Sequence, residues 1–131
     1  MEANVQKDEL VYRAIKRSKP NWLEEAKATS AMFKDIGGNS VDRDGGRSRE
    51  DIIAFMDAGV FAKRLKGIVE LHADKCMDIG TKIISAPTEL NPYHANIFLS
   101  EDEAKANVQA LMLADMATLI YFNTEMEWVR I

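Results

Sequence analysis

The stretch that decides the fold is residues 100–120, with the sequence SEDEAKANVQALMLADMATLI. Ser100 is a favourable helix N-cap residue, and Glu103 three positions later completes a capping box. Apolar residues then recur at spacings of three and four on one face of the predicted helix: Ala104, Val108, Leu111, Met112, Met116, Leu119 and Ile120. A long helix with one apolar face needs a second layer to bury that face.

Shorter segments supply that layer. Short runs with apolar alternation predict strands at residues 10–15, 40–42, 67–73, 82–85, 93–99 and 125–131. Within the first of these runs, Val11, Arg13 and Ile15 are expected to share one face of the strand. Ser48, followed by Asp51, predicts the start of a second helix, whereas residues 22–33 fit either a helix or an extended segment. We therefore expect a single α+β domain over residues 1–131, with a loose polar leader at 1–8. A small, mostly antiparallel sheet would pack against a long C-terminal helix.

Composition narrows the class of protein. The chain has 131 residues, of which 47% are hydrophobic and 29% charged, and its net charge is -4. An acidic chain has no global field that attracts nucleic acid, so nucleic acid is not an expected partner. Cys76 is the one cysteine, which excludes an intramolecular disulfide and agrees with a reducing, cytoplasmic setting. No apolar run reaches the ~20 residues that a membrane span needs.

A polar turn lies at residues 39–47, with the sequence NSVDRDGGR. Two glycines ahead of a capped helix expose backbone N–H groups, and the arginines add positive charge, so the turn is a candidate site for a phosphate or carboxylate. The candidate ligand-binding residues are Ser40, Asp42, Arg43 and Arg47, with Arg13 and Asn96 from neighbouring strands. The alternative is a hairpin turn whose aspartates and arginines pair with one another. That alternative is favoured, because no complete phosphate-loop signature is present.

The two histidines are the candidate acid–base groups. His72 shares a predicted strand face with Glu70, and His94 shares one with Asn96, so both faces could meet in a cleft with Arg13. His94 would be the catalytic acid or base, assisted by Glu70 or His72. The simpler hypothesis is that each histidine is a hydrogen-bonded structural residue. No ligand spacing points to a metal and no motif points to a cofactor, and Cys76 is expected to be a packed thiol.

Four phrases of the chain carry a resemblance. They are VYRAI (11–15), SAMFKD (30–35), SVDRDGGR (40–47) and NPYHANI (91–97). With them the chain resembles a group of small prokaryotic and phage proteins that string the same phrases together in the same order. The likeness covers residues 10–98 and leaves out the final helix. It implies a small cytoplasmic domain and no particular activity.

A second, looser pattern joins three separated places. Arg13, Thr29-Ser30 and Glu125-Met126-Glu127 are similar to the Arg, Ser-Thr-Ser and Glu-x-Glu pattern of ADP-ribosyltransferases. That resemblance implies an arginine on the dinucleotide phosphates and a glutamate that orients the ribose. The middle motif is incomplete, and the gap before Glu127 contains the large helix. The alternative is that Glu125 and Glu127 form a solvated strand face.

Two functions from different classes follow. The first, which we favour, is a small binding, regulatory or accessory protein that acts through the polar turn on a small anionic ligand, or on a protein partner. The apolar stripe of the last helix is expected to be core, or a homodimer face if the sheet is too small to cover it. The second is an enzyme for a nucleotide or phosphorylated substrate, ADP-ribosyltransferase-like at its most specific.

Overall fold

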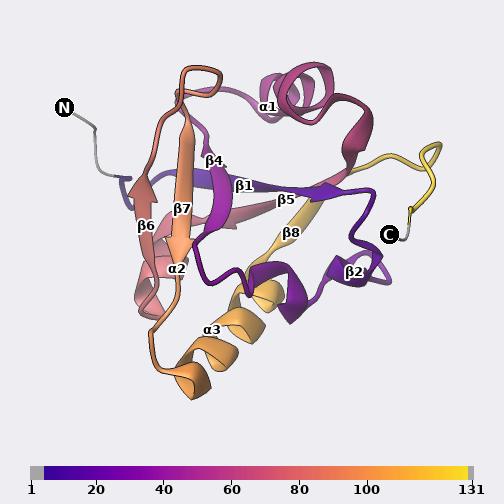
Figure 1. Ribbon diagram of the computed structural model, residues 1–131. Coiled ribbons are helices and arrows are strands. Elements are labelled where there is room, and N and C mark those ends of the chain that lie inside the picture. Colours follow the sequence, from indigo (N-terminus) through magenta and orange to yellow (C-terminus); the bar gives the residue numbers. More distant parts are fainter. Residues whose placement is uncertain (1–4, 130–131) are drawn as a thin grey trace.

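The structure is a computed structural model that describes residues 5–129 (Figure 1). It is an α+β fold built on a six-stranded sheet in the order β6-β7-β4-β1-β5-β8, and all neighbouring strands are antiparallel. The strands are β1 (Leu10–Lys16), β4 (Asn39–Arg43), β5 (Leu65–His72), β6 (Lys82–Ser85), β7 (His94–Phe98) and β8 (Thr118–Phe122). The α-helices are α1 (Arg49–Phe55), α2 (Ala73–Asp78) and α3 (Glu103–Met116). The predicted α+β class with an antiparallel sheet is confirmed.

Residues 22–33, which the sequence left open, contain short pieces. They include the two-stranded hairpin of β2 (Leu23–Glu24) and β3 (Lys27–Ala28), between the 3-10 turns η1 (Pro20–Trp22) and η2 (Ser30–Phe33). Glu25 and Ala26 form the turn of the hairpin, and both have positive φ, at 49° and 65°. Two successive residues of positive φ are the signature of a tight two-residue hairpin turn. Lys27 then donates to the carbonyl oxygens of Asp115 and Ala117, where a cation stabilises the end of α3.

The two faces of β1 support two separate cores. The predicted alternation is confirmed: Val11 and Ile15 face the core under α3, whereas Tyr12 and Ala14 face the core under α1. In Figure 1, α3 lies below the sheet and α1 above it. The α3 side also contains η1, η2 and α2. It holds the larger core, whose fully buried members are Val11, Ile15, Met32, Phe33, Val69, Leu71, Ala73, Cys76, Ala95, Ile97, Ala110 and Leu113.

On the other face, α1 begins where the sequence predicted. The Ser48 side chain accepts a hydrogen bond from the N–H of Asp51 at 3.2 Å, which caps the helix. Ile52 and Met56 are fully buried against Tyr12 and Ile68 of the sheet. Gly59 does not end the helix directly, because the chain first forms a π turn, η3 (Met56–Val60), and then the 3-10 turn η4 (Ala62–Arg64).

The start and the end of α3 correct the sequence prediction. Its N-cap is Asp102, whose carboxylate accepts from the N–H of Lys105 at 2.9 Å, so Ser100 lies outside the helix. The helix stops at Met116, because Thr118 to Phe122 pair with β5 as the edge strand β8. Leu119 and Ile120 therefore belong to a strand. The helix has 14 residues, about four turns.

The buried face of α3 also differs from the prediction. The side chains that meet the sheet are Gln109, Ala110, Leu113 and Ala114. Val108, Leu111 and Met112, which were expected to be core, are 55%, 60% and 42% exposed. The helix carries apolar residues on both sides, and the sheet and η2 cover only the side with the smaller residues.

Both ends of the described chain are attached to the body. The leader expected over 1–8 lies partly outside the described residues, but Val5 is buried in the α3-side core. The strand predicted over 125–131 is wrong for residues 125–129, which form no strand, and its last two residues lie outside the described part. Lys66 holds this tail: its ammonium group donates to the carbonyl oxygens of Asn123 and Met126 and lies 4.3 Å from the centre of the Phe122 ring. No helix within residues 5–129 has the length and apolar character that a bilayer span requires.

Candidate functional site

Four ionisable or polar side chains form a row across the α1 face of the sheet. Strand register places Glu70 of β5 opposite Tyr12 of β1, Tyr12 opposite Asp42 of β4, and Asp42 opposite His94 of β7. Cross-strand neighbours of this kind have Cβ atoms about 5 Å apart. Three of the four, Glu70, Asp42 and His94, are residues that the sequence proposed for a site.

At one end of the row, Glu70 is fully engaged. Its carboxylate is 5% exposed, accepts from the Tyr12 hydroxyl at 2.9 Å, and accepts from the Arg49 guanidinium at 2.7 and 2.8 Å. The Arg49 hydrogen bond is the main reason that the pKa of Glu70 is lowered. Burial, together with the Glu70 carboxylate, raises the pKa of Tyr12. A carboxylate held ionised by three hydrogen bonds serves well as a structural link between α1 and the sheet, and poorly as a base.

At the other end of the row, Asp42 and His94 are less saturated. Asn91 donates to one Asp42 oxygen at 2.8 Å, whereas the other oxygen is buried and has no hydrogen-bond partner. Arg47 lies 3.9 Å from that second oxygen. Burial raises the pKa of Asp42, against smaller opposing effects of Asn91, Arg47 and His94. The Nδ1 atom of His94 is 2.9 Å from the carbonyl oxygen of Ala86, which makes Nδ1 the protonated nitrogen of a neutral ring.

The arginines of the polar turn are occupied by protein groups. Arg43 donates to both carboxylate oxygens of Glu9, at 2.9 and 2.8 Å. Arg47 donates to the carbonyl oxygens of Arg43 and Asp44 and stacks on the Tyr93 ring at 3.7 Å. This is the self-paired turn that the sequence analysis favoured, with the arginine contacts mostly to Glu9, backbone and aromatic groups in place of the aspartates of the turn.

The remaining predicted residues do not join the row in one pocket. Arg13 lies on the opposite face, 3% exposed, where it donates to the carbonyl oxygens of Met32 and Ser40 and to Asp35. The expected convergence of Arg13 with the histidine-bearing faces therefore does not occur, because strand alternation sends Arg13 into the α3-side core. His72 is exposed at the end of β5, opposite Leu10. Ser40 and Asn96 face each other two residues along from Asp42 and His94.

The ADP-ribosyltransferase-like residues are also apart in their environments. Arg13 is buried, and its three donor nitrogens bind protein oxygens, so its guanidinium is not presented to a dinucleotide. Ser30 begins η2, with Thr29 just before it, whereas Glu125 and Glu127 are exposed in the tail after β8.

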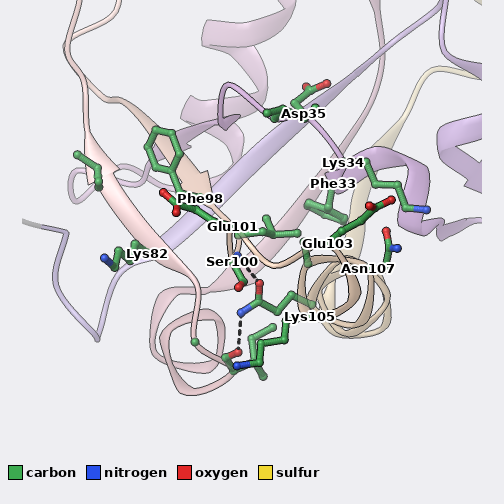
Figure 2. Close-up of a pocket in the computed structure, with 17 residues that line it drawn as sticks. Phe33, Lys34, Asp35, Lys82, Phe98, Ser100, Glu101, Glu103, Lys105 and Asn107 are labelled. Atoms are coloured by element: carbon green, nitrogen blue, oxygen red, sulfur yellow. Dashed lines mark hydrogen bonds between the residues drawn. The ribbon is translucent and has the colours of Figure 1, made fainter.

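The largest concave site lies elsewhere, at the end of the sheet where β7 leads into α3 (Figure 2). It is a cleft of about 1290 Å³ between the segment after η2, the α2–β6 connection and the first turns of α3. Gln109 closes its base by accepting from the N–H of Ser100 at 2.7 Å and donating to the carbonyl oxygen of Ile79 at 3.1 Å. Both ends of this amide are thus satisfied, which fixes the β7–α3 connection against the α2–β6 connection.

The cleft combines three kinds of lining group. Ile79, Phe98 and Leu99 supply apolar surface. Three lysines border it: Figure 2 shows Lys82 on one side, Lys34 on the other and Lys105 below. Three acidic residues complete the lining, namely Asp35, Glu101 and Glu103.

The charges of the cleft differ in whether they are paired. Asp35 is bound by Arg13 at 3.0 Å. The ammonium groups of Lys34, Lys82 and Lys105 have no hydrogen-bond or ion-pair partner within residues 5–129. Once Asp35 is paired with Arg13, the cleft holds three lysines against two glutamates.

Sequence reasoning missed this cleft. Its lysines come from three segments that are far apart in the chain, and lone lysines between apolar residues have no motif. The one usable signal was the alternation of residues 93–99, which places Phe98 on the same face as His94 and Asn96.

Two other chemistries have little support in the described part of the chain. Cys76 is fully buried, and burial raises the pKa of its thiol to about 12, far from that of a reactive nucleophile. No group of three histidine, cysteine, aspartate or glutamate side chains within residues 5–129 is arranged to hold a metal ion. Comparisons with protein-family models, curated proteins and solved structures find no match to this chain.

Proposed function

We propose that this protein is a small binding or accessory protein that takes an anionic ligand in the cleft of Figure 2. The observation that carries the proposal is the meeting of three unpaired lysines with an apolar wall in the largest concave site of the described chain. Small-molecule sites are typically mostly apolar clefts with a few polar groups that fix orientation. The lysines would hold the anionic group, since their charges are not spent inside the protein.

The other lining groups narrow the ligand class. Glu101 and Glu103 accept hydrogen bonds, so they favour a ligand that also carries hydroxyl or amino groups. Phe98 and Leu99 favour a flat or apolar portion. A nucleoside monophosphate uses all three kinds of group, because it joins a phosphate, ribose hydroxyls and a planar base.

The polar turn is the weaker candidate for the same ligand. An anion there would compete with Glu9 for Arg43, and with two carbonyl oxygens and the Tyr93 ring for Arg47. Replacing an existing charge-assisted hydrogen bond yields little net affinity. The preference for binding over catalysis rests on the same kind of observation, since Glu70 is saturated and Arg13 is buried.

The test is a thermal-shift screen with AMP, inorganic phosphate and benzoate as probes. A ligand at ~100 times its dissociation constant adds ~2.7 kcal/mol to the free energy of unfolding. We expect AMP to raise the melting temperature most, and Lys34→Gln/Lys82→Gln to abolish the rise. Lys63 and Lys75 are exposed and lie outside the cleft, so Lys63→Gln/Lys75→Gln matches the change in net charge.

The outcomes separate three explanations. A rise lost only in the cleft variant supports the cleft. Equal losses in the cleft variant and its control mean that overall charge alone attracts the probe. A rise lost in Arg43→Ala and kept in the cleft variant moves the site to the polar turn.

A further inference from the structure

The outer face of α3 is apolar at its centre. Val108 is 55% exposed, Leu111 60% and Met112 42%, and they lie on successive turns of the helix. Single exposed apolar side chains are common on protein surfaces, whereas a cluster on one element often marks an interaction site. This face is distinct from the cleft lysines Lys34 and Lys82, so the inference is independent of the proposed function.

The spacing along this face is that of a helix–helix contact. Ala104, Val108, Leu111 and Asp115 are separated by four, three and four residues, which places them in one line along α3. The same spacing brings core positions together in two-helix coiled coils. All four are exposed, and Lys105 lies beside the start of the line.

We propose that α3 pairs antiparallel with α3 of a second copy of this chain. In the register that centres the contact, Val108 of each copy packs on Leu111 of the other, so the apolar contact occurs twice about a two-fold axis. The same register brings Lys105 of each copy to the level of Asp115 of the other. The face is therefore complementary to itself in both shape and charge.

Charge also selects the orientation. A parallel pair would set Asp115 against Asp115 and Lys105 beside Lys105, and like charges across an interface are repulsive. The antiparallel pair replaces both repulsions by attractions. Because α3 has only 14 residues, the contact is small, and we expect a reversible dimer whose population rises with protein concentration.

The test is the oligomeric state of the full chain by sedimentation velocity over a concentration series up to the millimolar range. We expect the wild type to dimerise, and Val108→Gln/Leu111→Gln to remain monomeric over the same range. Leu90 is 86% exposed outside α3, so Leu90→Gln is the matched control and should dimerise as the wild type does. Circular dichroism confirms that each variant keeps the fold.

A charge swap tests the register. Lys105→Asp alone and Asp115→Lys alone should each weaken dimerisation at least several-fold, and the double variant should restore it. Residues 105 and 115 lie nearly three turns apart in one helix, about 15 Å, so rescue can arise only between copies. A wild type that stays monomeric throughout, dimers that survive Val108→Gln/Leu111→Gln, or a double variant without rescue would each overturn the proposal.

Discussion

The carboxylate of Glu70 receives both terminal donors of Arg49, at 2.7 and 2.8 Å, and so ties the first turn of α1 to the centre of the sheet. The pair is asymmetric: the Glu70 side chain is 5% exposed and that of Arg49 is 56% exposed. Solvent therefore screens the arginine, while the glutamate depends on its partners for stability in the ionised form.

The ionisation of Glu70 should be visible in the pH dependence of stability. Its folded pKa lies below the ordinary value of 4.5, so its contribution is complete above that value and is lost as the pH falls through the folded pKa. We expect Glu70→Gln to lose about 1 kcal/mol at pH 7, because the charge-assisted hydrogen bonds weaken. Urea unfolding at pH 7 and about pH 3 should show a larger acid-induced loss in the wild type than in the variant. An equal loss in both would mean that Glu70 is not a linked group.

Arg13 is predicted to be a structural residue. Replacing it by methionine leaves the buried carbonyl oxygens of Met32 and Ser40 without their donors, although it removes the cost of burying a charge that already lowers the pKa of Arg13. We expect the free energy of unfolding to fall by about 2–4 kcal/mol, measured by urea unfolding.

Asp35 provides the control for Arg13, because its carboxylate is 60% exposed. Asp35→Asn removes the ion pair and keeps both carbonyl contacts of Arg13, so its effect should stay within about 0.5 kcal/mol. Comparable losses in the two variants would show that the ion pair, and not the backbone contacts, is what Arg13 provides.

Gly45 is predicted to be irreplaceable at the polar turn, and Gly46 much less so. Both have positive φ, at 57° and 79°, but a Cβ atom on Gly45 would lie 2.4 Å from the Tyr93 ring, whereas one on Gly46 meets nothing within 4 Å. Gly46→Ala should cost about 1 kcal/mol from backbone strain alone. Gly45→Ala should cost at least ~1 kcal/mol more, since Tyr93 must leave its stack on Arg47. Equal melting temperatures for the two variants would contradict this difference.

Cys76 should be silent in the folded protein. Burial raises the pKa of its thiol to about 12, so almost no thiolate is present at mildly alkaline pH. We expect a disulfide reagent such as DTNB to label the native protein only as fast as it opens, and to label it at once in concentrated guanidinium chloride. Rapid stoichiometric labelling without denaturant would show that the thiol is accessible.

The strands were largely predictable, because each has a clear alternation between two buried or half-buried faces. Residues 82–85 were assigned to the correct strand, and the two faces of residues 10–15 were assigned correctly before any contact was known. The polar turn was equally legible, since Gly45 and Gly46 adopt the positive φ that such a turn needs.

The last helix was harder for a physical reason. Its two sides are both apolar, one with Ala110 and Ala114 and the other with Val108 and Leu111, so periodicity alone favours the larger side chains. The sheet instead packs against the smaller side, which only tertiary structure decides. The junction between α3 and β8 at Ala117 contains neither glycine nor proline, and this hid the change from helix to strand.

The strand order has a consequence for how the chain is made. β1 lies at the middle of the sheet between β4 and β5, so Val11 pairs with Arg43 on one side and with Leu71 on the other. During synthesis, the central strand emerges well before either of its neighbours and must wait with its backbone groups unpaired. Sheets closed by such distant pairings fold slowly, because the loop entropy is lost before the contacts form. Newly made chains are thus exposed to aggregation until β5 has left the ribosome, which makes translation speed upstream of Leu65 a determinant of the yield of folded protein.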